Sequence, residues 1–518
     1  MEHLPGEITI IILLSLASLV AILARRVRLP YTIALVLTGL TLGVLRIAED
    51  IPLPQLTPHF ILVTCLPGLV FEAAFHLDYE QLRENIRPIT VLAVPGVILS
   101  AGVVGTVLHL GLGLRWPVAL LFGTLISATD PISVVALFRE LGAPRRLAYV
   151  VEGESLFNDG TSIVFFRIIQ GIILAGAFSL GDSVRQFVQV VFGGAVMGLA
   201  VGYLFARLME RIDDHLVEIT LTVVLAYGVY LLAETAHVSG VIAVVVAGLI
   251  MGNYGARTSM SPTTKLTLVS FWEYVAFLTN SLIFLLLGMQ VNLPLLGQYA
   301  VPILWAIGAV LVGRAAVVYL LCWAIHRLSR PIPPSWQHVL FWGGVRGSIS
   351  LALALSLDAR LAERELLQVM AFGYVLFGLV VQGLTVGPLI KRLRLAHRSP
   401  VRLTYERLWG RMLARRRAWR TLQQMQEDGV ITQSLWRELG AEYRLAGQQL
   451  MAQIEQLYQE HPELLQSEAT AVRRECLQVE RSTLWDLWQR GEISEEVYRD
   501  LSTTVDRELD ALQDTEMA

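Results

Sequence analysis

Apolar residues in the first 395 positions are grouped into long runs, each close to the length of a membrane-spanning helix. A helix needs about 20 apolar residues to cross a bilayer, and the chain contains about thirteen such segments. The predicted spans are 7–24, 30–48, 57–77, 87–110, 117–139, 147–175, 185–209, 216–236, 239–254, 266–292, 299–325, 337–357 and 365–391. Residues 1–395 are therefore expected to form an all-α, polytopic membrane domain.

From residue 396 onward the chain is strongly charged and has no long apolar run. The segment 425–439 recurs as 487–501, and in the two copies Gly429 precedes Thr432 and Gly491 precedes Ser494. Because Gly often ends a helix and Thr or Ser often begins one, this repeat predicts two helical hairpins that pack as a small bundle. Residues 396–518 are expected to be a cytoplasmic helical tail, either a regulatory domain or a dimer clamp or inert extension.

Composition supports a membrane protein and narrows the chemistry. Only 16% of the residues are charged, against about 25% in soluble domains, and the net charge of −3 gives no reason to expect a nucleic-acid partner. Cys65, Cys322 and Cys476 lie far apart, which argues against disulfides and zinc. No basic residue cluster precedes the first apolar run, so that run is expected to be a retained span rather than a cleaved signal.

Basic residues concentrate in alternate loops between the predicted spans. Arg25 and Arg26 follow the first span, Arg145 and Arg146 follow the fifth, and Lys391 follows the last. The positive-inside rule therefore predicts that the odd-numbered loops and the tail are cytoplasmic and that the N-terminus is outside. An odd number of spans agrees with ends on opposite sides.

Helix breakers interrupt two spans at equivalent positions. Asp130-Pro131 lies in the fifth span, and Gly343-Gly344-Val345-Arg346-Gly347 lies in the twelfth, which is the fifth span of a second six-span set. Transporters are often built from two inverted repeats with the binding site at matching broken helices. The chain is therefore expected to contain two inverted six-helix repeats with crossed broken helices, joined by the seventh span. Pro131 should unwind the fifth span near Asp130.

Two carboxylates are placed near the middle of adjacent spans, at Asp130 and Asp159. Such groups are costly in a bilayer and mark ion or proton pathways. Ser155 lies four residues before Asp159, on the same helix face, and unwinding should free the carbonyl of Thr129. These oxygens form a ligand set typical of a hard cation such as sodium. Burial and mutual repulsion favour the protonated form of paired carboxylates, so protons and cations are expected to compete for the same oxygens.

Three further charged residues are predicted near this site. Arg346, in the broken twelfth span, needs an anionic partner, and Glu154 is the best candidate because it lies on a different helix face from Asp159. The Glu154–Arg346 pair is expected to hold the broken helix. Glu72, in the third span, is either a peripheral ligand or gate, or a structural residue.

The motifs Thr129-Asp130-Pro131, Glu154-Ser155-Leu156-Phe157-Asn158-Asp159-Gly160 and Gly343-Gly344-Val345-Arg346-Gly347 resemble those of sodium/proton antiporters of the NhaP/NHE type. The resemblance covers about residues 7–392. It implies a thirteen-helix homodimer with an elevator motion that exchanges one sodium or lithium ion for one proton, without a cofactor. The Asn-Asp pair resembles the electroneutral branch.

Carried over to this sequence, the resemblance assigns roles to individual residues. Asp159 becomes the principal carrier of ion and proton, and Asp130, Ser155 and the Thr129 carbonyl become ligands. Asn158 orients or stabilises the sodium site. Glu72 becomes a peripheral ligand through water.

The sequence leaves the cation and the transport mode open. A potassium/proton antiporter would use the same scaffold, and a sodium-coupled symporter or a non-transporting sensor are further alternatives. The expected location is the cytoplasmic membrane of a prokaryote.

Overall fold

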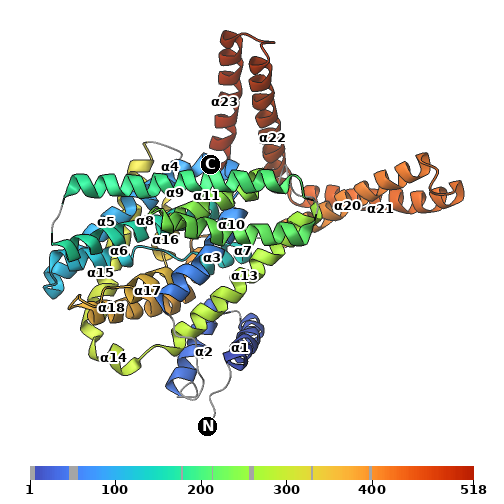
Figure 1. Ribbon diagram of the computed structural model, residues 1–518. Helices are drawn as coiled ribbons and strands as arrows, with labels where there is room; N and C mark the ends of the chain where they lie inside the picture. Colours follow the sequence, from blue (N-terminus) through green and yellow to red (C-terminus); the bar gives the residue numbers. More distant parts are fainter. Residues whose placement is uncertain are drawn as a thin grey trace. The chain divides into compact units, whose positions relative to one another are not determined.

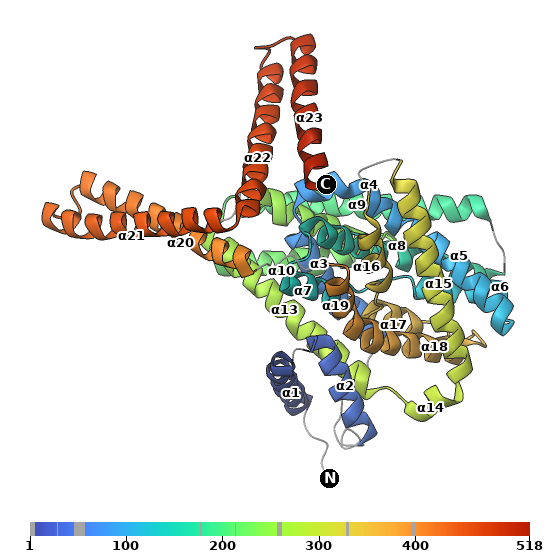
Figure 2. The same ribbon diagram turned by 180° about the vertical axis from the view of Figure 1, so that it is seen from behind.

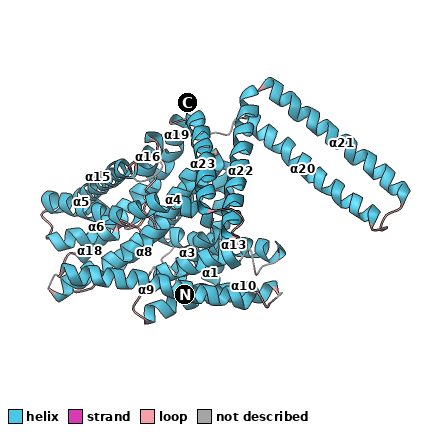
Figure 3. Ribbon diagram, turned by 90° about the horizontal axis from the view of Figure 1, so that it is seen from above, coloured by secondary structure: helices cyan, strands magenta, loops and turns pink. Residues whose placement is uncertain are grey.

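The computed structural model describes residues 6–27, 29–45, 57–176, 179–212, 214–255, 262–327, 331–395 and 400–517. These residues form helices joined by turns and loops, with no strand among them (Figure 3). The chain divides into two compact units, Met1–His397 and Arg398–Ala518. The first unit contains the long apolar helices, and the second contains the charged tail.

Thirteen helical segments make up the described part of the first unit (Figures 1 and 2). In chain order they are α1 (Gly6–Val27), α2 (Tyr31–Val44), η1 and α3 (Phe60–Cys65 and Leu66–His76), α4 and α5 (Tyr79–Ala93 and Pro95–Leu112), α6 and α7 (Trp116–Leu125 and Ile132–Leu141), α8 (Arg145–Ala175), α9 (Leu180–Met209), α10 (His215–Thr235), α11 and η2 (Gly240–Ile250 and Met251–Gly255), α13 (Pro262–Met289), α15 (Ala300–Ile325), α16 and α17 (Pro334–Trp342 and Ser348–Leu355), and α18, η3 and α19 (Arg364–Phe377, Gly378–Gln382 and Gly383–Arg392). A short helix, α14 (Leu293–Gln298), lies between α13 and α15.

This architecture confirms the predicted polytopic helical fold. Seven helices in the described part are long and apolar enough to cross a membrane, and shorter apolar helices supply other segments. The sequence placed the start of the fourth span at residue 87, whereas the helix begins at Tyr79. Its first two turns are rich in charged residues, so hydropathy alone does not detect them.

The two six-segment halves have matching interruptions. The fifth segment of the first half is broken between α6 and α7, and the fifth segment of the second half is broken between α16 and α17. The two broken segments are seven positions apart in the series, which is an odd offset, so equivalent helices run in opposite directions across a membrane. The predicted inverted repeat with broken helices is therefore confirmed.

Close backbone contacts hold the helices together. A Cβ atom added to Gly39 of α2 would lie 3.0 Å from the Cα atom of Gly288 in α13. Small residues allow this approach, which van der Waals packing between membrane helices requires. A larger side chain at either position would separate α2 from α13.

The second unit contains two antiparallel hairpins, α20 (Pro400–Glu427) with α21 (Gln433–Glu460) and α22 (Pro462–Gln489) with α23 (Glu495–Met517). Gly429 and Gly491 occupy their turns with φ values of 72° and 71°, a conformation that favours glycine. The hairpin turns thus lie where the repeat predicted them.

The arrangement of the hairpins differs from the predicted bundle. Tyr405, Ile454 and Leu464 form a small apolar cluster where α20, α21 and α22 meet. Beyond this corner the two hairpins point in different directions (Figure 1). One residue, His461, separates the end of α21 from Pro462, the first residue of α22. The chain direction changes at this short connection.

Candidate functional site

The two interrupted helices meet at their breaks. Residues 126–131 separate α6 from α7, and residues 343–347 separate α16 from α17. The backbone N–H of Asp130 donates a hydrogen bond to the carbonyl of Val345 at 2.8 Å. Irregular backbone at membrane depth is tolerated only where it is buried in protein or lines a water-filled cavity. The break in the first half falls immediately before α7, where Pro131 predicts it.

Gly347 allows this close approach. A Cβ atom at this position would lie 2.7 Å from Cγ of Asp130, which is closer than real Cβ contacts. The hydroxyl of Ser350, in α17, donates to the carbonyl of Ala128 at 3.2 Å. The second half of the chain therefore fixes the position of Asp130 in the first half.

α8 lines the other side of the break with polar side chains. The hydroxyl of Ser155 donates to the carbonyl of Thr129, and it accepts a hydrogen bond from the Thr129 hydroxyl at 3.1 Å. The amide nitrogen of Asn158 donates to the carbonyl of Ser127 at 2.9 Å, and its amide oxygen accepts from Ser162 at 2.7 Å. These contacts satisfy carbonyl groups that the break releases from helical hydrogen bonding.

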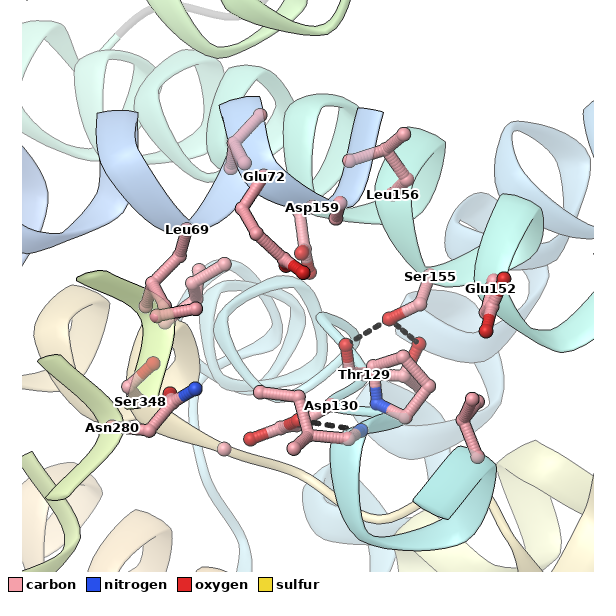
Figure 4. A pocket seen from close by; sticks show the side chains of 18 of the residues that line it. Leu69, Glu72, Thr129, Asp130, Glu152, Ser155, Leu156, Asp159, Asn280 and Ser348 are labelled. Atoms are coloured by element: carbon pink, nitrogen blue, oxygen red, sulfur yellow. Dashed lines mark hydrogen bonds between the residues drawn. The ribbon is translucent and has the colours of Figure 1, made fainter. Parts of the chain in front are cut away.

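A pocket of about 570 Å³ extends to this region. Asp130, Asp159 and Glu72 line it, as do Thr129 and Ser155 (Figure 4). Asp159 is 9% exposed, and its Oδ1 atom has no hydrogen-bond partner among the described residues. Asp159 and Asp130 lie close enough to repel each other electrostatically. The pocket thus contains two neighbouring carboxylates and several neutral oxygens.

Ionisable groups lie close together in pairs elsewhere along the pocket wall. The imidazole of His76 lies 3.3 Å from the carboxylate of Glu72, and Arg139 lies 3.4 Å from Glu152. All four residues line the pocket. Their side chains are between 24% and 71% exposed, so they lie nearer to solvent than Asp159.

The predicted Glu154–Arg346 ion pair is wrong. Glu154 instead forms a two-pronged salt bridge with Arg314 of α15, and Arg314 also donates to the carbonyl of Leu340 at 3.0 Å. The pair ties α8 and α15 to α16, the helix that precedes the second break. The sequence analysis assigned no role to Arg314, because spacing could not decide which of two arginines in apolar spans contacts Glu154.

Arg346 lies within the second break and is only 1% exposed. Its Nε and Nη1 atoms have no hydrogen-bond partner among the described residues. It lies within electrostatic range of Asp159 and Glu154. Its charge is therefore compensated at a distance rather than by a direct salt bridge.

Two other expectations about ligands need revision. Asn158 is not among the residues that line the pocket, because its amide holds the break. The Thr129 carbonyl accepts the Ser155 hydroxyl, so a cation would have to compete with that hydrogen bond. Asn280 of α13 and Ser348 of α17 also line the pocket. The sequence analysis singled out neither residue, since neither is charged or part of a spacing pattern.

No cluster of three or more His, Cys, Asp or Glu side chains that could hold a metal occurs in the described ranges. Two carboxylates with neutral oxygens suit a weakly held, hard cation that binds and leaves.

Comparisons with known proteins identify the family of this chain. Residues 11–392 match the family described as the transmembrane sodium/hydrogen exchanger. The chain is 38% identical over 512 residues to a protein named Na(+)/H(+) antiporter NhaG from Bacillus atrophaeus, and the match covers 96% of each chain. It is 44% identical over 390 residues to the Na(+)/H(+) antiporter ApNhaP of Aphanothece halophytica, covering 75% of this chain and 74% of that one.

A solved structure shares the fold. The sodium proton antiporter MjNhaP1 from Methanocaldococcus jannaschii superposes with a TM-score of 0.62 at 23% identity, covering 74% of this chain and 97% of that chain. The matched region ends before the charged tail in the family comparison. The protein is a member of the sodium/hydrogen exchanger family.

Proposed function

We propose that this protein is an electroneutral sodium(lithium)/proton antiporter. The observation that carries the proposal is the pair Asp130 and Asp159, which line one pocket beside two helix breaks. Relatives with 37–44% identity are named Na(+)/H(+) antiporters. Sodium, lithium and protons are the transported substrates, and no cofactor is required.

The proposed exchange is competition for one site. Asp159 carries the proton in one half of the cycle and binds the cation in the other. Asp130, Ser155 and the Thr129 carbonyl complete the cation shell, and Glu72 contributes through water. A cation in this pocket replaces the hydrogen bond between Ser155 and the Thr129 carbonyl, so cation binding and a local hydroxyl rotation are coupled.

The remaining site residues have structural roles in this proposal. Asn158 stabilises the first break by its hydrogen bond to the Ser127 carbonyl. Glu154 stabilises the second break by its salt bridge to Arg314, which in turn donates to the Leu340 carbonyl. Pro131 terminates the break at α7. An asparagine does not carry a proton, so one exchanging carboxylate per cycle agrees with electroneutral transport.

Transport in proteoliposomes tests the proposal. Purified protein is reconstituted with an internal pH dye, and sodium, lithium or potassium is added outside with the membrane potential clamped or free. We expect sodium or lithium to move protons at a rate that does not depend on the potential, and Asp159→Asn to abolish the response. Asp182→Asn, a change near the start of α9 away from the pocket, serves as the matched control and should retain transport.

The same assay separates the alternatives. A response to potassium alone would replace the proposal with potassium/proton antiport. Proton movement that follows the membrane potential would contradict electroneutrality. No response to any cation, with correctly folded protein, would refute antiport.

We further propose that the protein lies in the cytoplasmic membrane with its N-terminus outside and its tail in the cytoplasm. The support is the excess of Arg and Lys in alternate loops. Cysteine labelling of Ser434→Cys in the tail, in intact cells and after permeabilisation, tests the orientation. Labelling in intact cells would contradict it.

A homodimer is also proposed, from the family resemblance. The long helix α9 carries exposed apolar side chains at helical spacing, among them Phe192, Val196 and Leu199, and such a face suits either lipid or a second copy. Native mass spectrometry of the detergent-solubilised protein measures the state directly. A monomer under conditions that preserve transport would refute the dimer.

For the tail we propose regulation of transport by pH or by a partner. Deletion of residues 400–518 should then shift the pH profile of transport. An unchanged profile in folded protein would leave the dimer clamp or an inert extension, and native mass spectrometry of the same variant separates these two.

A further inference from the structure

Charge is divided unevenly between the two hairpins of the tail. α20 carries seven Arg and two Glu residues, whereas α23 carries eight Asp or Glu residues and two Arg. Over each hairpin as a whole, residues 400–460 have a net charge of +2 and residues 462–517 have a net charge of −8. Complementary charge steers association and suppresses wrong partners. Contact between unlike hairpins is therefore favoured over contact between two acidic ones.

α22 carries an uncovered apolar stripe, which consists of Leu465, Ala469, Val472, Cys476 and Val479. Leu465, Val472 and Val479 follow a seven-residue spacing and are 49%, 57% and 59% exposed. Ala469 and the free thiol of Cys476 lie between them and are also exposed. Small and apolar residues at alternating spacings of four and three form the seam along which one helix packs against another. The α22 stripe is therefore a seam that no helix covers in the described part of the tail.

α20 carries an exposed basic face, which consists of Trp409, Leu413, Arg416 and Arg420. Successive members of this face are three or four residues apart, so they share one side of the helix. Trp409 and Leu413 are 38% and 46% exposed, and both arginines are exposed. The α20 face thus combines an apolar centre with positive charge. Glu475 and Glu480 border the α22 stripe, so the two surfaces are complementary.

The link between the hairpins is too short for one to fold back onto the other. Only His461 separates α21 from α22, whereas antiparallel helices are joined by about two to five residues. Leu464, in the first turn of α22, is buried against Tyr405 and Ile454, so the corner is held by packing. α20 and α23 make no extended contact in the described part of the tail. Each surface therefore needs a partner from another molecule.

A second copy of this chain offers surfaces of the required size. α20 and α22 are each 28 residues long, which is about 42 Å at about 1.5 Å per residue. A hairpin is about 20 Å wide, so two hairpins packed face to face would bury roughly 800 Å² per partner, the size of a standard stable interface. Two-fold symmetry would form this contact twice. Short connections also favour exchange of elements between copies.

We propose that the tails of two copies pack reciprocally, with the α20 face of each copy against the α22 stripe of the other. This inference rests on the proposed homodimer, which brings two tails to the same side of the membrane, and not on the transported ion. A lipid surface would suit the basic α20 face, but anionic lipid would repel the acidic hairpin. A second copy satisfies both surfaces, and the tails then join the two protomers outside the membrane.

Disulfide cross-linking between two differently tagged full-length chains tests the contact. One chain keeps Cys476 as its only cysteine. The other has no native cysteine and carries one new thiol on the α20 face, from Trp409→Cys, Leu413→Cys, Arg416→Cys or Arg420→Cys. The two chains are co-expressed and the membranes are oxidised. We expect a product that joins the two tags from at least one of the four positions, because their spacing covers the length of the face.

Arg411→Cys is the matched control. Arg411 is exposed but lies two residues from Trp409 and from Leu413, which places it on about the opposite side of α20. Its cross-linking rate should be at least several-fold lower than the fastest rate on the α20 face. Pull-down through one tag verifies that mixed pairs form.

Charge reversal tests why unlike hairpins pair. Arg416→Glu with Arg420→Glu, on the chain that carries Leu413→Cys, should slow the cross-link several-fold. Glu475→Arg with Glu480→Arg on the Cys476 chain should slow it opposite an unchanged α20 and restore it opposite the reversed α20. The restored rate separates charge pairing from misfolding and from any effect on the thiol. Raising the salt from about 0.1 M to about 1 M shortens the Debye length from about 10 Å to about 3 Å and should slow the parent cross-link.

Three results would overturn the inference. The first is no product between the tags from any of the four α20 positions, and the second is equal rates from the α20 face and from Arg411→Cys. The third is preferential linkage of Cys476 to the same residue of a second copy, which would mean that like hairpins pair. Burial of the four α20 thiols by anionic vesicles, without any product between the tags, would assign the face to lipid instead.

Failure of the earlier proposals is distinguishable from failure of this one. In native mass spectrometry, a dimer that lacks the cross-link would refute the tail contact alone, whereas a monomer would refute the homodimer as well. Loss of the antiport proposal would leave the cross-linking unchanged, because no step of it depends on transport.

Discussion

The buried Glu154–Arg314 pair gives a quantitative test of how the broken helices are held. Its side chains are 2% and 7% exposed, and the Arg314 guanidinium also reaches the Leu340 carbonyl. Removal of one member of a buried pair leaves the other charge uncompensated and costs about 3–5 kcal/mol. Glu154→Gln should therefore lower the free energy of unfolding by that amount.

A second ion pair provides the control. Arg115 and Glu363 lie 2.9 Å apart with side chains 64% and 22% exposed, and exposed pairs contribute about 0–1 kcal/mol. In the largest soluble domains, a loss of 1 kcal/mol in the free energy of unfolding lowers the unfolding temperature by about 2 °C. On that basis, Glu154→Gln should lower the unfolding temperature by about 6–10 °C. Arg115→Gln should lower it by about 2 °C or less.

The assay is thermal unfolding of detergent-solubilised protein at one fixed scan rate, since large proteins often unfold irreversibly. A double-mutant cycle then compares Glu154→Gln with Arg314→Met and with Arg346→Met. The coupling should be larger with Arg314. Equal losses from the buried and exposed pairs, or a stronger coupling with Arg346, would refute the reasoning.

Three further predictions follow from local geometry. Gly347→Ala should slow transport strongly because its methyl group would meet Asp130, whereas Gly228→Ala, with open space around it, should leave the proteoliposome rate unchanged. In the turn between α17 and α18, hydrogen bonds from Arg360 lower the pKa of Asp358 to about 2. A depressed folded pKa stabilises the fold above the unfolded value of about 3.9, so the protection of this turn against hydrogen exchange, measured relative to the intrinsic exchange rate at each pH, should fall as the pH falls from about 4 to about 2. Asp358→Asn should remove that dependence. In the tail, Gly491→Ala should increase hydrogen exchange of the α22–α23 hairpin, because φ is 71° at that position. Gly447→Ala, within α21, should instead slow exchange in that helix, because nothing lies near the added methyl group. The opposite order would contradict the turn geometry.

Much of the fold could be predicted because membrane insertion imposes length and polarity on each segment. Apolar runs located the thirteen segments, and Pro131 and the Gly343–Gly347 run located both breaks. The charged start of α4 was missed because hydropathy measures the lipid-facing part of a helix and not its full length. The hairpin turns of the tail were predicted from Gly429 and Gly491, but the divergence of the hairpins depends on a tertiary corner that has no periodic signal.

The site was predicted less completely, and the reason is tertiary geometry. Asp130 and Asp159 were found because carboxylates in apolar spans are rare. The partner of Glu154 was misassigned because Arg314 and Arg346 are both buried arginines and only their positions in space distinguish them. Asn280 and Ser348 come from two distant segments of the second half, so no local pattern could bring them to the pocket.

The hydrogen bond between Asp130 and Val345 has a consequence for how the protein is made. Its donor and acceptor are about 215 residues apart in the chain, and ribosomes add about 5–20 residues per second. The first break is therefore present in the membrane for about 10–40 s before the second break, which contains Val345, is synthesised. During that time a polar loop lies at membrane depth without its final hydrogen bond. The nascent first half must be sheltered by water, by the insertion machinery or by temporary contacts, and agents that slow synthesis of the second half should increase its degradation.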